Sequence, residues 1–281
     1  MDSVIRLERG DFACTVRPGL GGALTGFTWR GVPLLRPTPI DARTVTDCAC
    51  FPLVPFANRI ARGRFSFQDI DVRLPVPPGD GPHALHGHGW RAAWDMVDHG
   101  QDQAILDHHH TTDAWPWPYE AVQGVDLVEG GLDLSLSLWS RGEAPMPFSL
   151  GLHPYFPRTG ATRLNLNVDG VWRTDAEALA LEWIEDGPEM DWLTHGRLPA
   201  TLVDHCYGPW DGRAVIETPE GRLTLTSDAG WLQVYAPPGA DFFCLEPVTH
   251  PPDAFNRADG AGVLAPGGLQ VLNMELRFEP G

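Results

Sequence analysis

A single histidine lies inside the apolar stretch SLGLHPYFP, residues 149–157. The proline that follows it has no backbone N–H, so the strand-like run is interrupted at this histidine. A histidine has an ordinary pKa near 6.5 and can therefore gain or lose a proton close to neutral pH. His153 is either a buried histidine satisfied by a hydrogen bond or a proton-transfer group that faces a pocket.

A glutamate ends a second apolar run, FFCLE, within the segment DFFCLEPVTHPPDAFN at residues 241–256. A carboxylate at the end of a buried run is costly unless it is paired or has a function. Glu246 could form a structural salt bridge with an arginine. Burial beside an acid–base partner would instead make it a functional residue.

Asn58 and Arg59 interrupt the apolar start of CFPLVPFANRIARGRF, residues 50–65. Taken alone, the pair is typical of a surface turn. Alternatively, amide and guanidinium groups at this position could form the polar edge of a pocket and hydrogen-bond the hydroxyl groups of a ligand.

Three histidines, His83, His86 and His88, fall within PHALHGHGWRAAW, residues 82–94. Imidazole is a common zinc ligand, but the chain has no HExxH motif and no cysteine pair with zinc-finger spacing. Alternate spacing would place His86 and His88 on the same face of a strand. Adjacent strand residues point to opposite faces, so the run His108–His110 is a weaker candidate. We expect no metal.

Composition excludes several classes of protein. The 281 residues carry a formal net charge of −17, and all 20 basic residues are arginine, so neither nucleic acid nor an anionic membrane surface is an expected partner. The chain begins without the apolar core of a signal peptide and has no run long enough to span a membrane. Five cysteines, an odd number, indicate reduced thiols and a cytoplasmic location. Motifs typical of α/β-hydrolases and nucleotide-binding folds are missing.

The elements that must position these residues are strands, because the dominant period is two. Alternating or apolar runs predict strands at 104–110, 119–128, 132–140, 163–168, 222–227, 231–237, 241–247 and 269–280, and FSFQDIDVRLP (65–75) predicts two strands around a turn at Gln68–Asp69. GLGGAL (19–24) is interpreted as a turn. Helical signal is scarce, and only 174–186, with a possible capping box, could form a short helix or a loop. We predict an all-β fold, a large antiparallel β-sandwich, as a single domain over residues 1–281.

Five motifs, in order along nearly the whole chain, resemble the aldose 1-epimerase (galactose mutarotase) family. They are CFPLVPFANRIARGRFSF, HALHGHGW, GLHPYFP, VDHCY and FFCLEPVTHPPDAFN. The resemblance implies a large antiparallel β-sandwich, which agrees with the period-two pattern. The segment Gly-His-Gly-Trp after His86, and the proline after Glu246, differ from the better-known galactose enzymes and resemble a bacterial branch of the family.

The resemblance also implies roles. His153 matches the family's general acid and Glu246 its general base. Asn58, Arg59, His86 and Asp204 match positions that bind the sugar. The implied reaction opens and recloses a hemiacetal: the base removes the O1 proton and the acid protonates the ring oxygen O5. We expect Glu246 to be ionised at neutral pH and a nearby carboxylate to raise the pKa of His153.

The implied activity is aldose 1-epimerase, with a small-molecule sugar as partner, no cofactor, and a monomeric or homodimeric protein. Three alternatives remain open. A hexose-6-phosphate 1-epimerase could use arginines for phosphate contacts, a carbohydrate-binding protein would lack catalysis, and a metal-dependent sugar lactonase is more distant. The arginines proposed for phosphate are Arg59, Arg62, Arg64 and Arg91. Three aromatic residues near the motifs, Trp90, Tyr155 and Trp210, could cover a sugar face or simply pack in the core.

Overall fold

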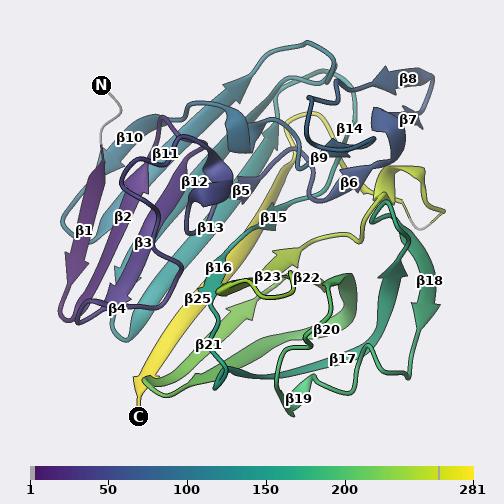
Figure 1. Cartoon of the computed structure of the whole chain (residues 1–281). Helices are drawn as coiled ribbons and strands as arrows, with labels where there is room; N and C mark the ends of the chain where they lie inside the picture. The colour runs from purple at the N-terminus through teal and green to yellow at the C-terminus, as the bar shows by residue number, and fades with distance from the viewer. Residues whose placement is uncertain (1–3, 259) are drawn as a thin grey trace.

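A computed structural model describes residues 4–258 and 260–281 of the chain, and most of its regular structure is β-strand (Figure 1). The helices in these ranges are short 3₁₀ turns: η1 (Val45–Asp47), η2 (Ala61–Gly63), η3 (Gly89–Arg91) and η4 (Ala254–Asn256). No helix in the described part of the chain has the length and apolar character needed to cross a membrane. The prediction of an all-β fold is confirmed.

A four-stranded antiparallel sheet is formed by the N-terminal strands β1 (Ile5–Arg9), β2 (Phe12–Arg17), β3 (Ala23–Trp29) and β4 (Val32–Pro33). It lies against the part of the main sheet that contains β11 and β12, so two layers face one another on this side of the molecule (Figure 1).

The main sheet has 15 strands. In hydrogen-bonded order its central path is β10 (Asp95–His99), β11 (Gln103–His110), β12 (Tyr119–Val128), β13 (Gly131–Ser140), β25 (Leu269–Pro280), β21 (Gly221–Ser227), β20 (Val203–Thr218), β22 (Trp231–Ala236), β23 (Phe242–Val248), β15 (Gly151–Leu152) and β5 (Pro52–Leu53). Beside this path, β16 (Tyr155–Pro157) pairs with β23, and β17 (Arg163–Thr174) pairs with β20, β18 (Ala180–Ile184) and β19 (Thr194–Gly196).

Three two-stranded ribbons complete the described strands: β6 (Arg59–Ile60) with β9 (Ala84–Leu85), β7 (Arg64–Phe67) with β8 (Ile70–Arg73), and β14 (Met146–Phe148) with β24 (Gly262–Leu264). The β7–β8 hairpin turns where the sequence indicated, with Gln68 at φ 52°. The shortest ribbon, β6–β9, joins the two loops that carry Asn58 and His86.

The alternation of apolar and polar residues along a strand places the apolar side chains on the buried face of the sheet. Along β13, leucines 132, 134, 136 and 138 are all buried, and the residues between them are more exposed. Leu7, Val16 and Phe27 of the four-stranded sheet belong to the same hydrophobic core. Burying these side chains between two layers removes apolar surface from water, which is the main favourable contribution to the stability of such a fold.

The predicted turn at residues 19–24 is confirmed, and it also positions a loop of the site. Gly21 and Gly22 have positive φ values of 67° and 64°, a conformation that glycine adopts without steric cost. A Cβ atom on Gly21 would lie 1.9 Å from the Trp90 carbonyl oxygen. Only glycine therefore allows this turn to pack against the η3 segment.

The possible helix at 174–186 is wrong. The chain turns after Thr174 and then returns as β18, with Trp172 opposite Trp183 in the ladder. The Asp175 carboxylate accepts the backbone N–H groups of Glu177 and Leu179, at 2.8 and 3.0 Å, and so stabilises the turn. Cross-strand pairing outweighs the helical tendency of an alanine- and glutamate-rich segment.

Candidate active site

The strand that carries His153 is broken directly opposite Glu246. Residues on both sides of the break pair with β23: Gly151 lies opposite Val248, and Tyr155 lies opposite Cys244. This register places residue 153 across from residue 246. Pro154 prevents a continuous ladder here, so the two side chains meet at a gap between β15 and β16.

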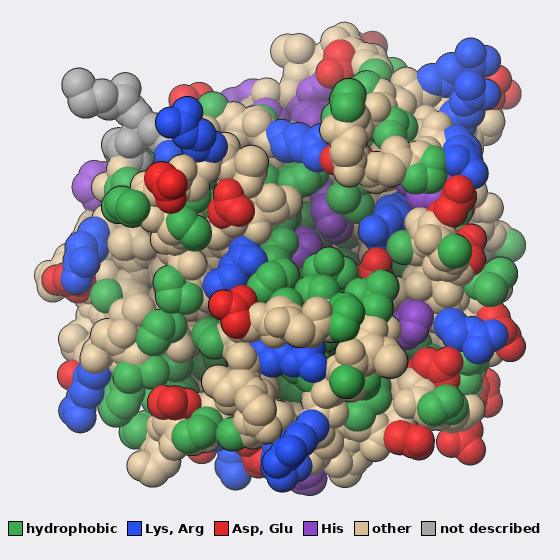
Figure 2. Space-filling view, viewed as in Figure 1, with side chains coloured by type: hydrophobic (Ala, Val, Ile, Leu, Met, Phe, Trp, Pro, Cys, Tyr) green, Lys and Arg blue, Asp and Glu red, His purple; other side chains and the backbone are tan. Residues whose placement is uncertain are grey.

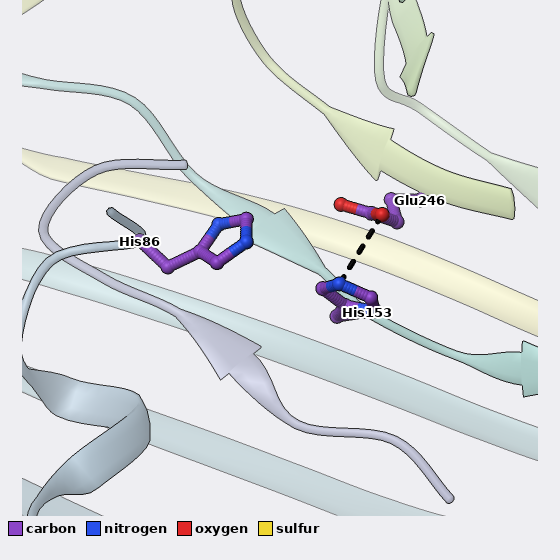
Figure 3. A group of neighbouring side chains, drawn as sticks. All are labelled: His86, His153 and Glu246. Carbon is purple, nitrogen blue, oxygen red and sulfur yellow. Dashed lines mark ion pairs between the residues drawn. The ribbon is translucent and has the colours of Figure 1, made fainter. Parts of the chain in front are cut away.

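His153 and Glu246 contact one another (Figure 3), and both residues line a cavity. The His153 Nε2 atom lies 3.2 Å from Glu246 Oε1. Both residues are buried, with 6% and 2% of their surface exposed. The His153 ring packs against both Phe51 and Tyr155, at centroid distances of 4.6 and 4.8 Å, and these contacts hold it in one orientation. His153 thus faces the cavity as the sequence motif implied.

Burial determines how this pair ionises. Desolvation lowers the pKa of His153 to about 3, and it raises the pKa of Glu246 well above its usual range. The expectation that a neighbouring carboxylate raises the pKa of His153 is therefore wrong, because loss of hydration outweighs that attraction. Two buried groups in contact share one proton over a wide pH range. Their combined charge is zero whichever group holds it.

Asn58 and His86 fix one another across the β6–β9 ribbon. Both adopt left-handed φ values, 60° and 58°, that are strained for residues with side chains. The His86 N–H donates to the Asn58 carbonyl at 2.9 Å, and the Asn58 N–H donates to His86 Nδ1 at 3.0 Å. Because Nδ1 accepts a hydrogen bond, the neutral ring carries its proton on Nε2. Figure 3 shows this ring turned toward His153 and Glu246.

The three histidines of the 82–94 segment lie in three different environments. His83 accepts the Arg62 N–H at its Nδ1, and His88 contacts the Tyr119 hydroxyl at 2.8 Å, whereas His86 lines the cavity. The expectation that His86 and His88 share one face is wrong. The chain leaves β9 in a left-handed conformation at His86 and Gly87, which turns the two side chains apart.

Asp204 and Arg59 form the polar wall of the cavity. Arg59 Nη2 lies 3.5 Å from Asp204 Oδ2, and Gln233 Nε2 donates to Asp204 Oδ1 at 2.6 Å. Gln233 is itself opposite Glu246 in the β22–β23 ladder. Burial raises the pKa of Asp204, while Arg59 and Gln233 act against that shift. The wall therefore offers fixed donors and acceptors for the polar groups of a ligand.

The cavity has a volume of about 350 Å³ and brings together all six residues named from the sequence. These are Asn58, Arg59, His86, His153, Asp204 and Glu246. Figure 2 shows histidine side chains recessed near the middle of this face, with basic and acidic groups close by. The size is suited to a single small ligand.

Aromatic side chains line part of the cavity. Trp90 and Tyr155 both face it, as the motifs suggested. Trp210 does not: it is buried in the core, and its indole N–H donates to the Arg213 carbonyl at 3.1 Å. Apolar ring faces beside polar groups suit a sugar, which has both C–H surfaces and hydroxyl groups.

Sequence reasoning missed several residues that line the cavity, among them Gln233, Tyr235, Phe242 and Arg36. A glutamine inside the apolar run WLQVYAP was a signal, since a buried amide needs a partner. Arg36 carried no such signal, because it lies in a loop more than a hundred residues from His153 in sequence.

His86, His153 and Glu246 could each offer one ligand atom to a metal ion, with these atoms within 4.8 Å of one another. The chemistry of His86 argues against that use. Its Nδ1 accepts the Asn58 N–H, so its Nε2 holds a proton and has no free lone pair for a metal. These three side chains are therefore better suited to hydrogen bonding than to binding a metal ion.

His88 should make the protein sensitive to mild acid. Burial lowers its pKa to about 4, so acid protonates this residue first in the unfolded chain, where its pKa is near 6.5. His88→Gln keeps a hydrogen-bonding group beside Tyr119 and removes the titration. Between about pH 7.5 and 5.5, the wild type should lose about 1 kcal/mol more of its free energy of unfolding than the variant. Urea denaturation at both pH values measures the free energy of unfolding. The prediction is contradicted if the wild type and His88→Gln lose equal stability, or if His99→Gln, a control at an exposed position, differs from the wild type as much as His88→Gln does.

The fold and the site define the class of protein. The sequence profile of the aldose 1-epimerase family matches residues 3–277, and the chain belongs to that family. It is 35% identical over 277 residues to the uncharacterised protein YphB of Escherichia coli strain K12, covering 92% of this chain and 93% of that protein. The chain is also 24% identical over 270 residues to the uncharacterised protein YihR of the same organism, covering 90% of this chain and 85% of that one.

Solved structures agree with this assignment. The crystal structure of a candidate aldose 1-epimerase from Escherichia coli K12 superimposes with a TM-score of 0.93 at 33% identity, with 99% of each chain covered. A galactose mutarotase-like protein from Clostridium acetobutylicum has the same fold, with a TM-score of 0.86 at 20% identity over 99% of this chain and 95% of that one. The predicted resemblance and the predicted type of β-sandwich are both confirmed.

Proposed function

We propose that this protein is an aldose 1-epimerase, an isomerase that interconverts the α and β anomers of an aldose whose O1 hydroxyl is free. The observation that carries the proposal is the buried contact between His153 and Glu246, which both line a sugar-sized cavity. Sugar binding alone does not require an acid–base pair. Family membership supports the same reaction.

In the proposed reaction, Glu246 takes the proton from the O1 hydroxyl while His153 donates one to O5, and the C1–O5 bond breaks. The open aldehyde rotates about C1–C2, and both transfers then reverse to close the ring on the other face. Asn58, Arg59, His86 and Asp204 hold hydroxyl groups distant from C1, so that this end of the sugar can turn. Acid–base transfer is sufficient for these steps, and the proposal includes no cofactor.

The buried environment favours this exchange of protons. Ring opening starts from the form of the pair in which an imidazolium lies beside a carboxylate, and burial destabilises both of these charges. After ring opening it is a neutral imidazole beside a carboxylic acid, the state favoured by the shifted pKa values of both residues. Desolvation therefore makes His153 a stronger acid and Glu246 a stronger base than either would be in water.

The arginines named for a hexose 6-phosphate are largely occupied by acids. Arg59 pairs with Asp204 at 3.5 Å, and Arg62 pairs with Glu177 at 2.8 Å. Arg91 likewise pairs with Asp80 at 2.6 Å. Arg64 lies outside the cavity, in a separate hollow. These four arginines therefore do not support the hexose-6-phosphate 1-epimerase alternative.

The direct test is polarimetry of freshly dissolved α anomers, with the uncatalysed rate subtracted. A panel of common neutral and acidic aldoses should include at least one whose approach to anomeric equilibrium is accelerated. The rate should persist after exhaustive dialysis against a chelator, because no step uses a metal. Acceleration of none of the sugars would sink the proposal, and loss of rate that zinc restores would replace its mechanism with a metal-dependent one.

The pH profile of kcat tests the shared proton. With the pKa of His153 near 3 and that of Glu246 raised, the one-proton state of the pair persists through neutral pH and well into acid. We expect kcat, once corrected for solvent catalysis, to be flat between about pH 5 and 7. A fall of kcat on acidification with an apparent pKa near 6.5 would show that His153 titrates as a hydrated histidine.

A further inference from the structure

One cation lines the cavity without a carboxylate partner. Arg36 follows β4, and its backbone N–H donates to the Tyr155 carbonyl at 2.8 Å. Its guanidinium carbon lies 3.9 Å from the centre of the Tyr155 ring and 4.6 Å from that of Phe242. Among the residues that the structure describes, no carboxylate forms an ion pair with it, although acids outnumber arginines in this chain, 37 to 20.

The guanidinium is held in place, yet part of it remains available. Its Nη2 donates to the backbone carbonyls of Thr46 and Cys48, the latter at 2.9 Å. Within the described ranges, all hydrogen bonds to this group use Nη2, and Nε is buried without a partner. Nη1 makes no hydrogen bond within the described ranges and is not one of the buried unpartnered atoms, so it is the donor that a ligand in the cavity can reach.

The other charges of the cavity balance one another. His153 and Glu246 share one proton, so the pair has no net charge. Arg59 is matched by Asp204 at 3.5 Å. The remaining charge is the guanidinium of Arg36, which gives the cavity a net positive charge inside a strongly acidic protein.

Arg36 is also at a suitable distance from the chemistry. Its guanidinium and the His153 ring both lie against Tyr155, at 3.9 and 4.8 Å from that ring's centre. The separation between guanidinium and imidazole therefore cannot exceed the sum of those two distances. One sugar ring with C1 at His153 can place its far, exocyclic carbon near Arg36.

We propose that Arg36 binds an anionic group on the exocyclic end of the sugar, so that the preferred substrates are aldoses carrying a carboxylate or a phosphate at C6. This inference rests on the proposed function. It names a residue outside the set first considered for phosphate, and a guanidinium suits either anion because its fork of donors matches their oxygens.

Binding of non-reacting sugars tests the subsite without any catalysis. Methyl α-D-glucopyranoside and methyl α-D-glucopyranosiduronic acid cannot open their rings, and they differ only in the carboxylate. Calorimetry should show the acidic glycoside binding at least about tenfold more tightly to the wild type, as one charge-assisted contact provides. Arg36→Met should remove that preference and leave the affinity for the neutral glycoside within about threefold.

Kinetics identify the anion and separate charge from packing. Glucose, glucuronate and glucose 6-phosphate are compared by kcat/KM for anomer exchange, with Arg36→Lys as the charge-retaining variant. The Lys variant should keep part of the preference that Arg36→Met loses. Arg30→Met is the matched control, because Arg30 also lies over an aromatic ring, Trp29, but does not line the cavity and is paired with Asp11. A higher kcat/KM for glucuronate assigns a carboxylate subsite, and a higher one for glucose 6-phosphate a phosphate subsite.

Two results would overturn the proposal. The first is that the wild type binds the neutral and acidic glycosides with equal affinity. The second is that Arg36→Met loses affinity for both glycosides equally, which would show that Arg36 acts only in packing. Failure of the proposed function looks different. In that case the acidic glycoside binds through Arg36, yet no sugar reaches anomeric equilibrium faster.

Discussion

Glu246→Gln is expected to lower kcat for anomer exchange by roughly 10²–10⁴-fold, the usual contribution of one proton-transfer group. The amide keeps the shape of the side chain and can still donate a hydrogen bond to His153 Nε2, now 3.2 Å from Oε1. It cannot accept the O1 proton. KM should change much less, since the residues that bind distant hydroxyl groups are untouched.

The measurement for Glu246→Gln is the decay of optical rotation at saturating substrate. The matched control is Glu8→Gln, which changes an exposed glutamate of β1 that pairs with Arg6 on the surface. If Glu246→Gln retains near wild-type kcat while binding sugar normally, then Glu246 is a structural carboxylate and another group is the base.

His153→Asn removes the other half of the pair, and we expect a similar loss of kcat, roughly 10²–10⁴-fold. Asparagine keeps some hydrogen bonding but cannot deliver a proton to O5. The double variant with Glu246→Gln should be little worse than either single variant, because residues that act in one coupled step are strongly non-additive. Additive losses would indicate two independent roles.

His153→Asn also leaves space beside Phe51 and Tyr155, so its folding needs a separate check. Affinity for a methyl glycoside and the thermal midpoint report whether the cavity is intact. His99→Asn, at an exposed position on β10, is the control. Normal binding with lost kcat supports the acid role; normal binding with full kcat returns His153 to the status of a buried, hydrogen-bonded histidine.

Strands with clear alternation were readable from the sequence, whereas the longest strand, β20, was not predicted, and β17 was predicted only as far as residue 168. The alternation of Leu132 to Leu138 predicted β13 to within a residue, because a side-chain period of two has a direct consequence for burial. The segment 174–186 shows the limit of such reading. Its local pattern allowed a short helix or a loop, but its pairing with β17 depends on partners that local sequence does not reveal.

Much of the candidate site depends on strands of two residues, which have no detectable period. β6 and β9 each contain two residues, yet they hold Asn58 and His86 in strained conformations. Asn58 and His86 were predicted from the resemblance of their motifs to the family, and not from the hydrophobic periodicity. The ionisation of His153 could not be read either, because its pKa depends on burial by remote residues such as Phe51.

The pairing of distant segments has a consequence for how activity appears over time. β5, β15 and β23 lie side by side although about a hundred residues separate each from the next, and β13 pairs with β25 across a similar span. Neighbouring hairpins such as β11–β12–β13 need only local loop closure, whereas these distant contacts carry a much larger entropic cost and form slowly. During refolding from denaturant, we therefore expect the β-sheet signal to recover first and catalytic turnover to return only in the slowest phase, when the last distant strands join.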